Sequence, residues 1–241
     1  KTYWVSNSLK GKKRILVAPT QNLVLQCAKN YGAKPFYQDS KDVSNSDEFI
    51  VTTYKSLRAL SKKINLSQYL GFIDEAHNFT KSATSKFLLA TMTEVLELLS
   101  TFEKYFLLTA TPVYTKDEAL NIHTIKIKQE SVIKKTVTFV KYEDSVKTIY
   151  ELTTKSKENN NQWAIYLNNT NESGTLGRIQ AAVSEQNVPC INSTKKLEEQ
   201  YKKIAIDGDM SAYDGIISTS VLSEGTSITK HSNEMDIYII G

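Results

Sequence analysis

Short apolar runs recur in the first half of the chain, and each is followed by a stretch with helical spacing or by a polar turn. Runs of this length are typical of strands that are buried on both faces of a parallel sheet. The alternation of such strands with helices predicts a layered α/β domain. The expected strands are Arg14–Ala18, Phe49–Thr52, Leu70–Asp74 and Tyr105–Leu108, and the expected helices are Gln21–Tyr31, Tyr54–Leu60 and Thr84–Phe102.

The pattern loosens between Glu118 and Lys135, where the chain is polar and rich in lysine, and then starts again. A change of this kind indicates a domain boundary, so we predict two domains of class α/β in tandem, residues 1–124 and residues 125–241. In the second domain we expect strands at Val137–Val140, Trp163–Leu167, Gly215–Ser218 and Met235–Ile240, and helices at Asp144–Lys155, Glu172–Gln186 and Lys195–Ile204.

The composition is that of an ordinary globular protein, with 40% hydrophobic and 23% charged residues among 241. No window approaches the roughly 18 unbroken apolar residues that a membrane helix needs, so we expect no membrane association. The two cysteines, Cys27 and Cys190, lie far apart in the sequence, which argues against a disulfide framework and a zinc site. We therefore expect a reducing, cytoplasmic setting.

Positive charge is concentrated in the first half of the chain. Lys and Arg exceed Asp and Glu there by 16 to 11 up to Ile125, whereas 14 basic residues face 15 acidic ones afterwards, which gives +5 and −1 and the overall +4. This distribution is compatible with a polyanionic partner, although neutral enzymes also carry locally basic surfaces.

Two adjacent acids, Asp74 and Glu75, end the apolar run that begins at Leu70. In an open parallel sheet ligands bind outside the carboxyl ends of the strands, so both carboxylates are expected at a ligand crevice. One carboxylate can hold hydrated Mg²⁺ and the other can orient an attacking water, as nucleoside triphosphate hydrolysis requires. The alternative is a solvated turn, with His77 an ordinary surface or core histidine.

Companion segments in a fixed order decide between these alternatives. The segments Leu16–Thr20, Ile50–Tyr54, Asp74–His77, Leu108–Pro112 and Ile217–Ser220 with Glu224-Gly225 occur one after another, nearly spanning the chain. They resemble motifs Ia, Ib, II, III and V of superfamily 2 helicases and translocases of the DEAH or DExH kind. The resemblance implies two tandem RecA-like P-loop domains that bind ATP and Mg²⁺ in the cleft between them.

The resemblance also gives the first two residues a meaning. Lys1 and Thr2 match the end of a phosphate-binding loop, so Lys1 would contact the β and γ phosphates and the Thr2 hydroxyl would be a Mg²⁺ ligand beside Asp74. Glu224 and Gly225 would line the nucleotide cleft. The sequence then begins inside the loop and ends before motif VI, and we expect residues 1–241 alone to be inactive. The alternative for Lys1 is an ordinary terminal residue.

A nucleic-acid strand is the partner that the resemblance implies, bound through its backbone. Motif III would couple this strand site to hydrolysis, with His77 as the partner of its hydroxyl groups. For Thr52 and Thr53 the alternative is two β-branched residues that simply end a strand. The expected strand contacts are Pro19, Thr20, Gln21, Thr52, Thr53 and Thr219, and the expected coupling residues are Thr109, Ala110 and Thr111.

The sequence thus predicts an ATP hydrolase that couples hydrolysis to movement on single-stranded nucleic acid, DNA in preference to RNA, with other subunits or domains as further partners. Glu75 is the expected residue for polarising water. A non-catalytic nucleic-acid-binding or scaffolding module with the same fold is the main alternative, and an ATPase that acts on protein is a third.

Overall fold

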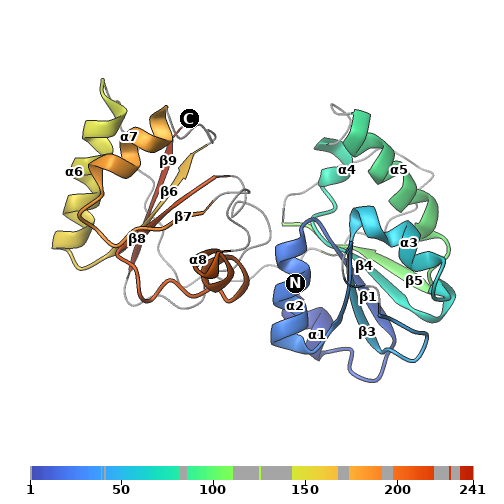
Figure 1. The fold of residues 1–241 in the computed structure, drawn as a ribbon. Coiled ribbons are helices and arrows are strands. Elements are labelled where there is room, and N and C mark those ends of the chain that lie inside the picture. Colours follow the sequence, from blue (N-terminus) through green and yellow to red (C-terminus); the bar gives the residue numbers. More distant parts are fainter. Residues whose placement is uncertain are drawn as a thin grey trace.

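The computed structural model describes residues 2–38, 40, 42–81, 86–110, 125, 143–167, 174–191, 198–219, 228 and 234–240. These residues form two α/β units, each built around its own parallel sheet (Figure 1). The predicted fold class is therefore confirmed. The predicted boundary between residues 124 and 125 is not tested, because residues 111–124 and 126–142 lie outside the described residues; the strand expected at Val137–Val140 lies outside them as well.

The first unit has a five-stranded sheet in the order β2-β3-β1-β4-β5, with every neighbouring pair parallel. Its helices lie on both faces of the sheet. In chain order the elements are α1 (Thr2–Asn7), β1 (Arg14–Ala18), α2 (Gln21–Tyr31), β2 (Lys34–Phe36), β3 (Phe49–Thr53), the 3-10 turn η1 (Tyr54–Ser56), α3 (Leu57–Ser61), the 3-10 turn η2 (Leu66–Gln68), β4 (Leu70–Ile73), α4 (Asn78–Lys81), α5 (Lys86–Leu99) and β5 (Lys104–Leu107).

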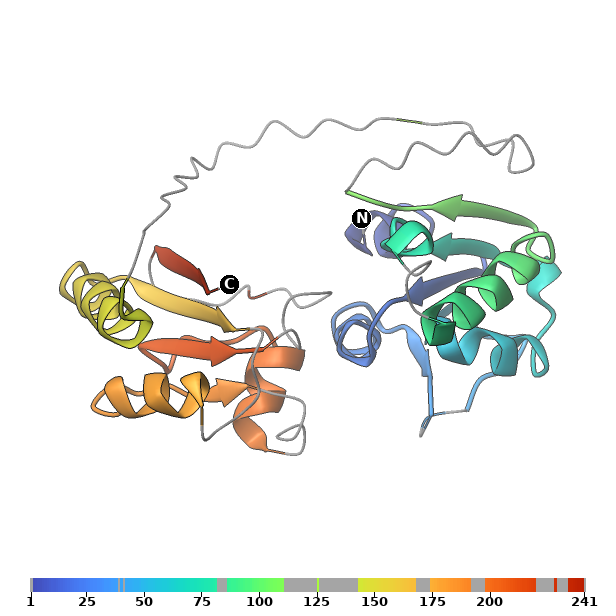
Figure 2. The ribbon, with the colours of Figure 1, turned by 90° about the horizontal axis from the view of Figure 1, so that it is seen from above.

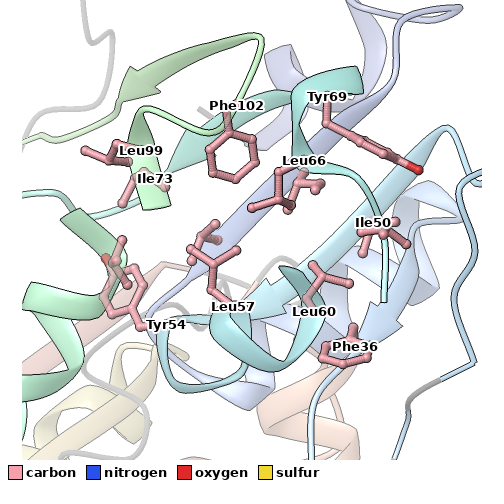
Figure 3. Packing of buried hydrophobic residues seen from close by; sticks show 14 of the residues in the cluster. Phe36, Ile50, Tyr54, Leu57, Leu60, Leu66, Tyr69, Ile73, Leu99 and Phe102 are labelled. Carbon is pink, nitrogen blue, oxygen red and sulfur yellow. The ribbon is translucent and has the colours of Figure 1, made fainter. Parts of the chain in front are cut away.

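Alternation along β1 shows how the core of this unit is divided. Ile15 and Val17 pack with α3 and α5 on one face, whereas Leu16 and Ala18 pack with α1 and α2 on the other. Figure 3 shows part of the first of these clusters. All five residues of β1 are buried because helices cover both faces, which explains the unbroken apolar run in the sequence.

The second unit has a four-stranded parallel sheet in the order β7-β8-β6-β9. Helices α6 and α7 cover one face, and α8 with a π-helix covers the other. The elements are α6 (Ser145–Glu158), β6 (Gln162–Leu167), α7 (Thr175–Ala182), β7 (Cys190–Ile191), α8 (Glu199–Tyr201), the π-helix η6 (Lys202–Ile206), β8 (Gly215–Ser218) and β9 (Met235–Ile240).

A polar contact joins the units along one stripe of α2. Asn22, Gln26 and Lys29 are spaced at i, i+4 and i+7, so they lie on the same side of the helix. Gln26 donates to the Ala205 carbonyl at 3.0 Å, and Lys29 pairs with Asp207 at 2.5 Å. Figure 2 shows α2, in blue, on the side of the first unit that faces the second. Small, polar interfaces of this kind allow domains to move relative to each other.

In the part of the chain that the structure describes, no helix is both long enough and apolar enough to cross a bilayer.

Candidate nucleotide and strand site

The carboxyl ends of four parallel strands meet at one edge of the first sheet. Ala18 at the end of β1 pairs with Thr53 at the end of β3, and Ile73 at the end of β4 pairs with Val17 and with Leu107 of β5. The segments that follow these strands are therefore neighbours. Together with Thr52 and Thr53, which end β3, they contain the described site residues that the sequence predicts in this unit, apart from Thr2.

The acid pair forms a tight turn immediately after β4. The Asp74 N–H donates to the Val17 carbonyl at 2.9 Å, and the Glu75 N–H donates to Oδ1 of Asp74 at 3.0 Å. Glu75 has φ 51, in the left-handed region, which costs a non-glycine residue about 1–2 kcal/mol. Strained backbone of this kind is concentrated at functional sites, where the surrounding contacts hold it in place.

His77 connects this turn to the segment after β5. Its Nδ1 lies 3.2 Å from Oε2 of Glu75 and 3.1 Å from Oγ1 of Thr109. A proton on Nδ1 would be shared between a carboxylate and a hydroxyl acceptor. The Ala76 N–H also donates to the Leu108 carbonyl at 2.9 Å, so the two segments are joined through backbone and side chains.

The contact between His77 and Thr109 is the one that the resemblance to motifs II and III leads us to expect. The coupling role of Thr109 stays a prediction. Ala110 directly follows it and is exposed, whereas Thr111 lies outside the described residues.

The first candidate strand contacts follow β1. Pro19, Thr20 and Gln21 are all partly exposed, and Thr20 caps α2 by accepting a hydrogen bond from the Leu23 N–H at 3.3 Å. The amino end of an 11-residue helix is thus presented beside these residues, where its N–H groups favour an anion such as a phosphate.

The next candidates end β3 and are largely buried. Thr52 has 0% exposure, and its hydroxyl lies 3.5 Å from the Thr53 carbonyl oxygen. Both faces of β3 are covered, so the Thr52 side chain is buried, and its contact with the strand stays a prediction. Thr53 is 8% exposed, and its hydroxyl donates to Oγ of Ser56 at 3.0 Å. We keep Thr53 as the candidate at this strand end.

The remaining predicted residues are dispersed. Thr2 begins α1 and is partly exposed, and its carbonyl accepts a hydrogen bond from the Ser6 hydroxyl at 2.8 Å. Thr219 follows β8 of the second unit, is 3% exposed, and donates its N–H to the Ile191 carbonyl. Their roles stay predictions, as do those of Lys1, Glu224 and Gly225, which lie outside the described residues.

Tyr54 is a residue of this edge that sequence reasoning missed. It follows Thr53 and begins η1, and its hydroxyl donates to the carbonyl oxygen of Asp74. Tyr54 was expected to begin a helix and to end the segment that resembles motif Ib, but the sequence offers no periodic signal for a contact with Asp74.

Residues 2–114 match the family described as "Type III restriction enzyme, res subunit". The matched range contains the whole first sheet and the acid pair. It covers slightly less than half of the chain. No curated protein matches the sequence.

Solved structures share the fold at low sequence identity. S. cerevisiae Dbp5 bound to RNA and ADP BeF3 aligns with a TM-score of 0.66 and 15% identity, over 99% of this chain and 74% of that one. The Escherichia coli DEAH/RHA helicase HrpB gives 0.60 and 17%, over 95% and 32%. The Mycobacterium smegmatis helicase Lhr bound to ssDNA and AMP-PNP gives 0.56 and 13%, over 98% and 40%. The two units are thus arranged in a fold that helicases share.

Proposed function

We propose that this chain is the motor part of a nucleic-acid-dependent ATPase of the superfamily 2 helicase and translocase kind. The observation that carries the proposal is the Asp74-Glu75 turn, placed where four parallel strands end and joined to Thr109 through His77. The match of residues 2–114 and the shared fold support it. The DEAH subtype belongs to the same proposal and rests on Asp74-Glu75-Ala76-His77.

Glu75 is the proposed catalytic residue. Its side chain is 25% exposed, so the carboxylate can reach a water molecule, while Nδ1 of His77 lies 3.2 Å from one carboxylate oxygen. A carboxylate positioned in this way orients the attacking water and accepts its proton. The left-handed backbone of Glu75 fixes the direction in which the carboxylate leaves the turn.

Mg²⁺ and ATP are the proposed cofactors. Mg²⁺ prefers oxygen ligands and is held in such sites by one or two protein oxygens, waters and the phosphates, where it neutralises developing charge. Asp74 and Thr2 offer a carboxylate and a hydroxyl, which is a suitable donor set, and Oδ1 of Asp74 is already oriented by the Glu75 N–H. Lys1 is the proposed phosphate contact, with Glu224 and Gly225 on the second unit's side of the nucleotide.

A single strand would lie along the edge formed by Pro19, Thr20, Gln21 and Thr53, with Thr219 contributing from the second unit. These groups suit phosphate oxygens and offer no pattern for reading bases, so binding is expected to be independent of base sequence. The basic first half of the chain adds electrostatic attraction for the phosphate groups of the strand. We propose DNA in preference to RNA, in a cytoplasmic setting; among the solved structures that share the fold, one is bound to RNA and another to ssDNA.

Strand-stimulated hydrolysis tests the proposal. ATP turnover by the protein that carries these residues should rise on addition of single-stranded DNA, less on addition of RNA, and not on addition of unfolded protein. Affinity for DNA should fall with salt, with a log-log slope of about −0.7 per neutralised phosphate. Salt-sensitive DNA binding without any turnover would favour a non-catalytic nucleic-acid-binding module instead. Stimulation of turnover by protein alone would favour an ATPase that acts on protein.

A further inference from the structure

The Tyr54 hydroxyl joins two strand ends that do not pair with each other. In the sheet order β2-β3-β1-β4-β5, β1 separates β3 from β4. Tyr54 directly follows β3, yet its hydroxyl donates to the Asp74 carbonyl after β4 and lies 3.4 Å from the Glu75 carbonyl oxygen. The side chain thus crosses the end of β1. It is 7% exposed, so water has little access to this contact.

The two carbonyl groups that Tyr54 approaches flank the strained part of the acid turn. The Asp74–Glu75 peptide must keep one orientation for Glu75 to stay at φ 51. Backbone bonds to Val17 and Leu108 hold the turn from β1 and from the segment after β5. Tyr54 adds a third anchor, from the direction of β3.

We propose that Tyr54 is a positioning residue that aligns Glu75 and makes this alignment depend on the strand site at Thr53. The inference rests on the proposed function, because it assigns Tyr54 a part in that same site. Thr53 and Tyr54 are consecutive, so a strand that orders the Thr53 end of β3 also orders the ring that follows it. Without the hydroxyl, the Asp74–Glu75 peptide can rotate towards the more favourable right-handed conformation, and the Glu75 carboxylate turns away from the water that it orients.

Tyr54→Phe isolates this hydroxyl. The ring belongs to the core cluster that includes Leu57, Ile73 and Leu99, and phenylalanine preserves that packing (Figure 3). The variant therefore removes the hydroxyl and keeps the ring.

Tyr69→Phe is a matched control within the same cluster. Tyr69 is 0% exposed, and its hydroxyl donates to the carbonyl groups of Asp47 and Ser44 at 3.0 Å and 3.3 Å. It precedes β4, whereas the acid pair follows Ile73 at the other end of that strand; Figure 3 labels Tyr69 and Ile73. Both variants lose a buried hydroxyl bonded to backbone carbonyls, but only Tyr54→Phe touches the acid turn.

The experiment uses the complete protein that carries these residues, and compares wild type and both variants in ATP turnover with and without saturating single-stranded DNA, and in the KM for ATP. Tyr54→Phe should lower the strand-stimulated kcat about 10-fold or more and reduce the ratio of stimulated to basal rate, with KM changed by no more than about twofold. Tyr69→Phe should keep both the kcat and the ratio.

Amide hydrogen exchange supplies a readout that does not require turnover. Tyr54→Phe should speed exchange of the Ala76 and Asn78 amides, and Tyr69→Phe should not. Equal kcat and equal exchange in the two variants would overturn the positioning role while leaving the proposed function intact. A wild-type protein that hydrolyses no ATP with any strand would overturn the proposed function and the role of Tyr54 together.

Discussion

The side chain of Asn22 in the first unit is hydrogen-bonded to the hydroxyl of Tyr201 in the second. Nδ2 of Asn22 donates to Tyr201 Oη at 2.9 Å, and Oδ1 of Asn22 lies 3.1 Å from the same oxygen. The two residues are 8% and 2% exposed. Asn22 lies two positions after Thr20, so the contact between the units begins beside the proposed strand site.

Tyr201→Phe should loosen the contact between the units. It leaves the buried Asn22 amide without this partner, which is expected to cost about 1–3 kcal/mol. Fluorescence energy transfer between dyes at the exposed positions of Lys12→Cys and Ser211→Cys should report a broader distance distribution in the variant. Tyr213→Phe is the control, because Tyr213 lies in the same unit as Tyr201 and takes no part in the contacts with α2 given above. Identical distributions in all proteins would show that the Asn22–Tyr201 bond does not hold the units together.

Gly215→Ala should destabilise the second unit strongly. A Cβ at this position would lie 2.2 Å from the Trp163 ring, and Trp163 is completely buried, so the ring cannot move aside. Overpacking of this kind typically costs about 1–3 kcal/mol, and occasionally more. Gly71→Ala, with its Cβ 2.8 Å from the Phe102 ring, should cost less. Urea unfolding of the two variants gives the order, and a larger loss for Gly71→Ala would contradict the packing described for Trp163.

Cys27 should resist alkylation in the native protein. Burial, followed by the charge of Asp74, raises the pKa of its thiol from 9.0 to about 12. At pH 8 the thiolate fraction is then about 10⁻⁴, and the thiolate is the reactive form. Mass spectrometry after iodoacetamide treatment should show modification of Cys27 only when denaturant opens the first unit. Rapid modification of the folded protein would place the thiol outside the core.

The same shift affects stability in alkaline solution. In the unfolded chain the thiol ionises near 9.0, whereas in the folded protein it stays protonated up to about 12. Its contribution is therefore fully present below pH 9 and is lost as the pH rises towards 12. The free-energy difference between wild type and Cys27→Ala should shrink over that range, as measured by urea unfolding at several pH values. A constant difference would contradict the raised pKa.

Strands β1, β3 and β4 of the first unit were predictable because they are buried on both faces, so a nearly unbroken apolar run marks each of them. β1 was predicted with its observed bounds, Arg14–Ala18, and β8 with Gly215–Ser218. β2 and β7 were missed because they have three and two residues and because Pro35 and Pro189 lie in or next to them. Such short segments carry too few positions for a period to show.

The acid pair of the site was predictable, whereas the hydrogen bond from Tyr54 that holds it in place was not. Asp74 and Glu75 stand out as charges at the end of an apolar strand. The contact of Tyr54 with Asp74 depends on two strand ends meeting across β1, which no local pattern records. The burial of Thr52 was not predictable either. Thr52 is a polar residue at a strand end, and it is buried because helices cover both faces of β3.

Glu75→Gln tests the central claim most directly. ATP affinity and strand-stimulated steady-state turnover should be measured side by side for wild type, Glu75→Gln and the exposed control Glu103→Gln at the opposite end of the sheet. If Glu75 orients the attacking water, Glu75→Gln should keep ATP binding nearly intact and lower turnover about 10²- to 10⁴-fold, while Glu103→Gln should match wild type. Near wild-type turnover in Glu75→Gln would contradict the assignment of this acid turn as the hydrolytic centre.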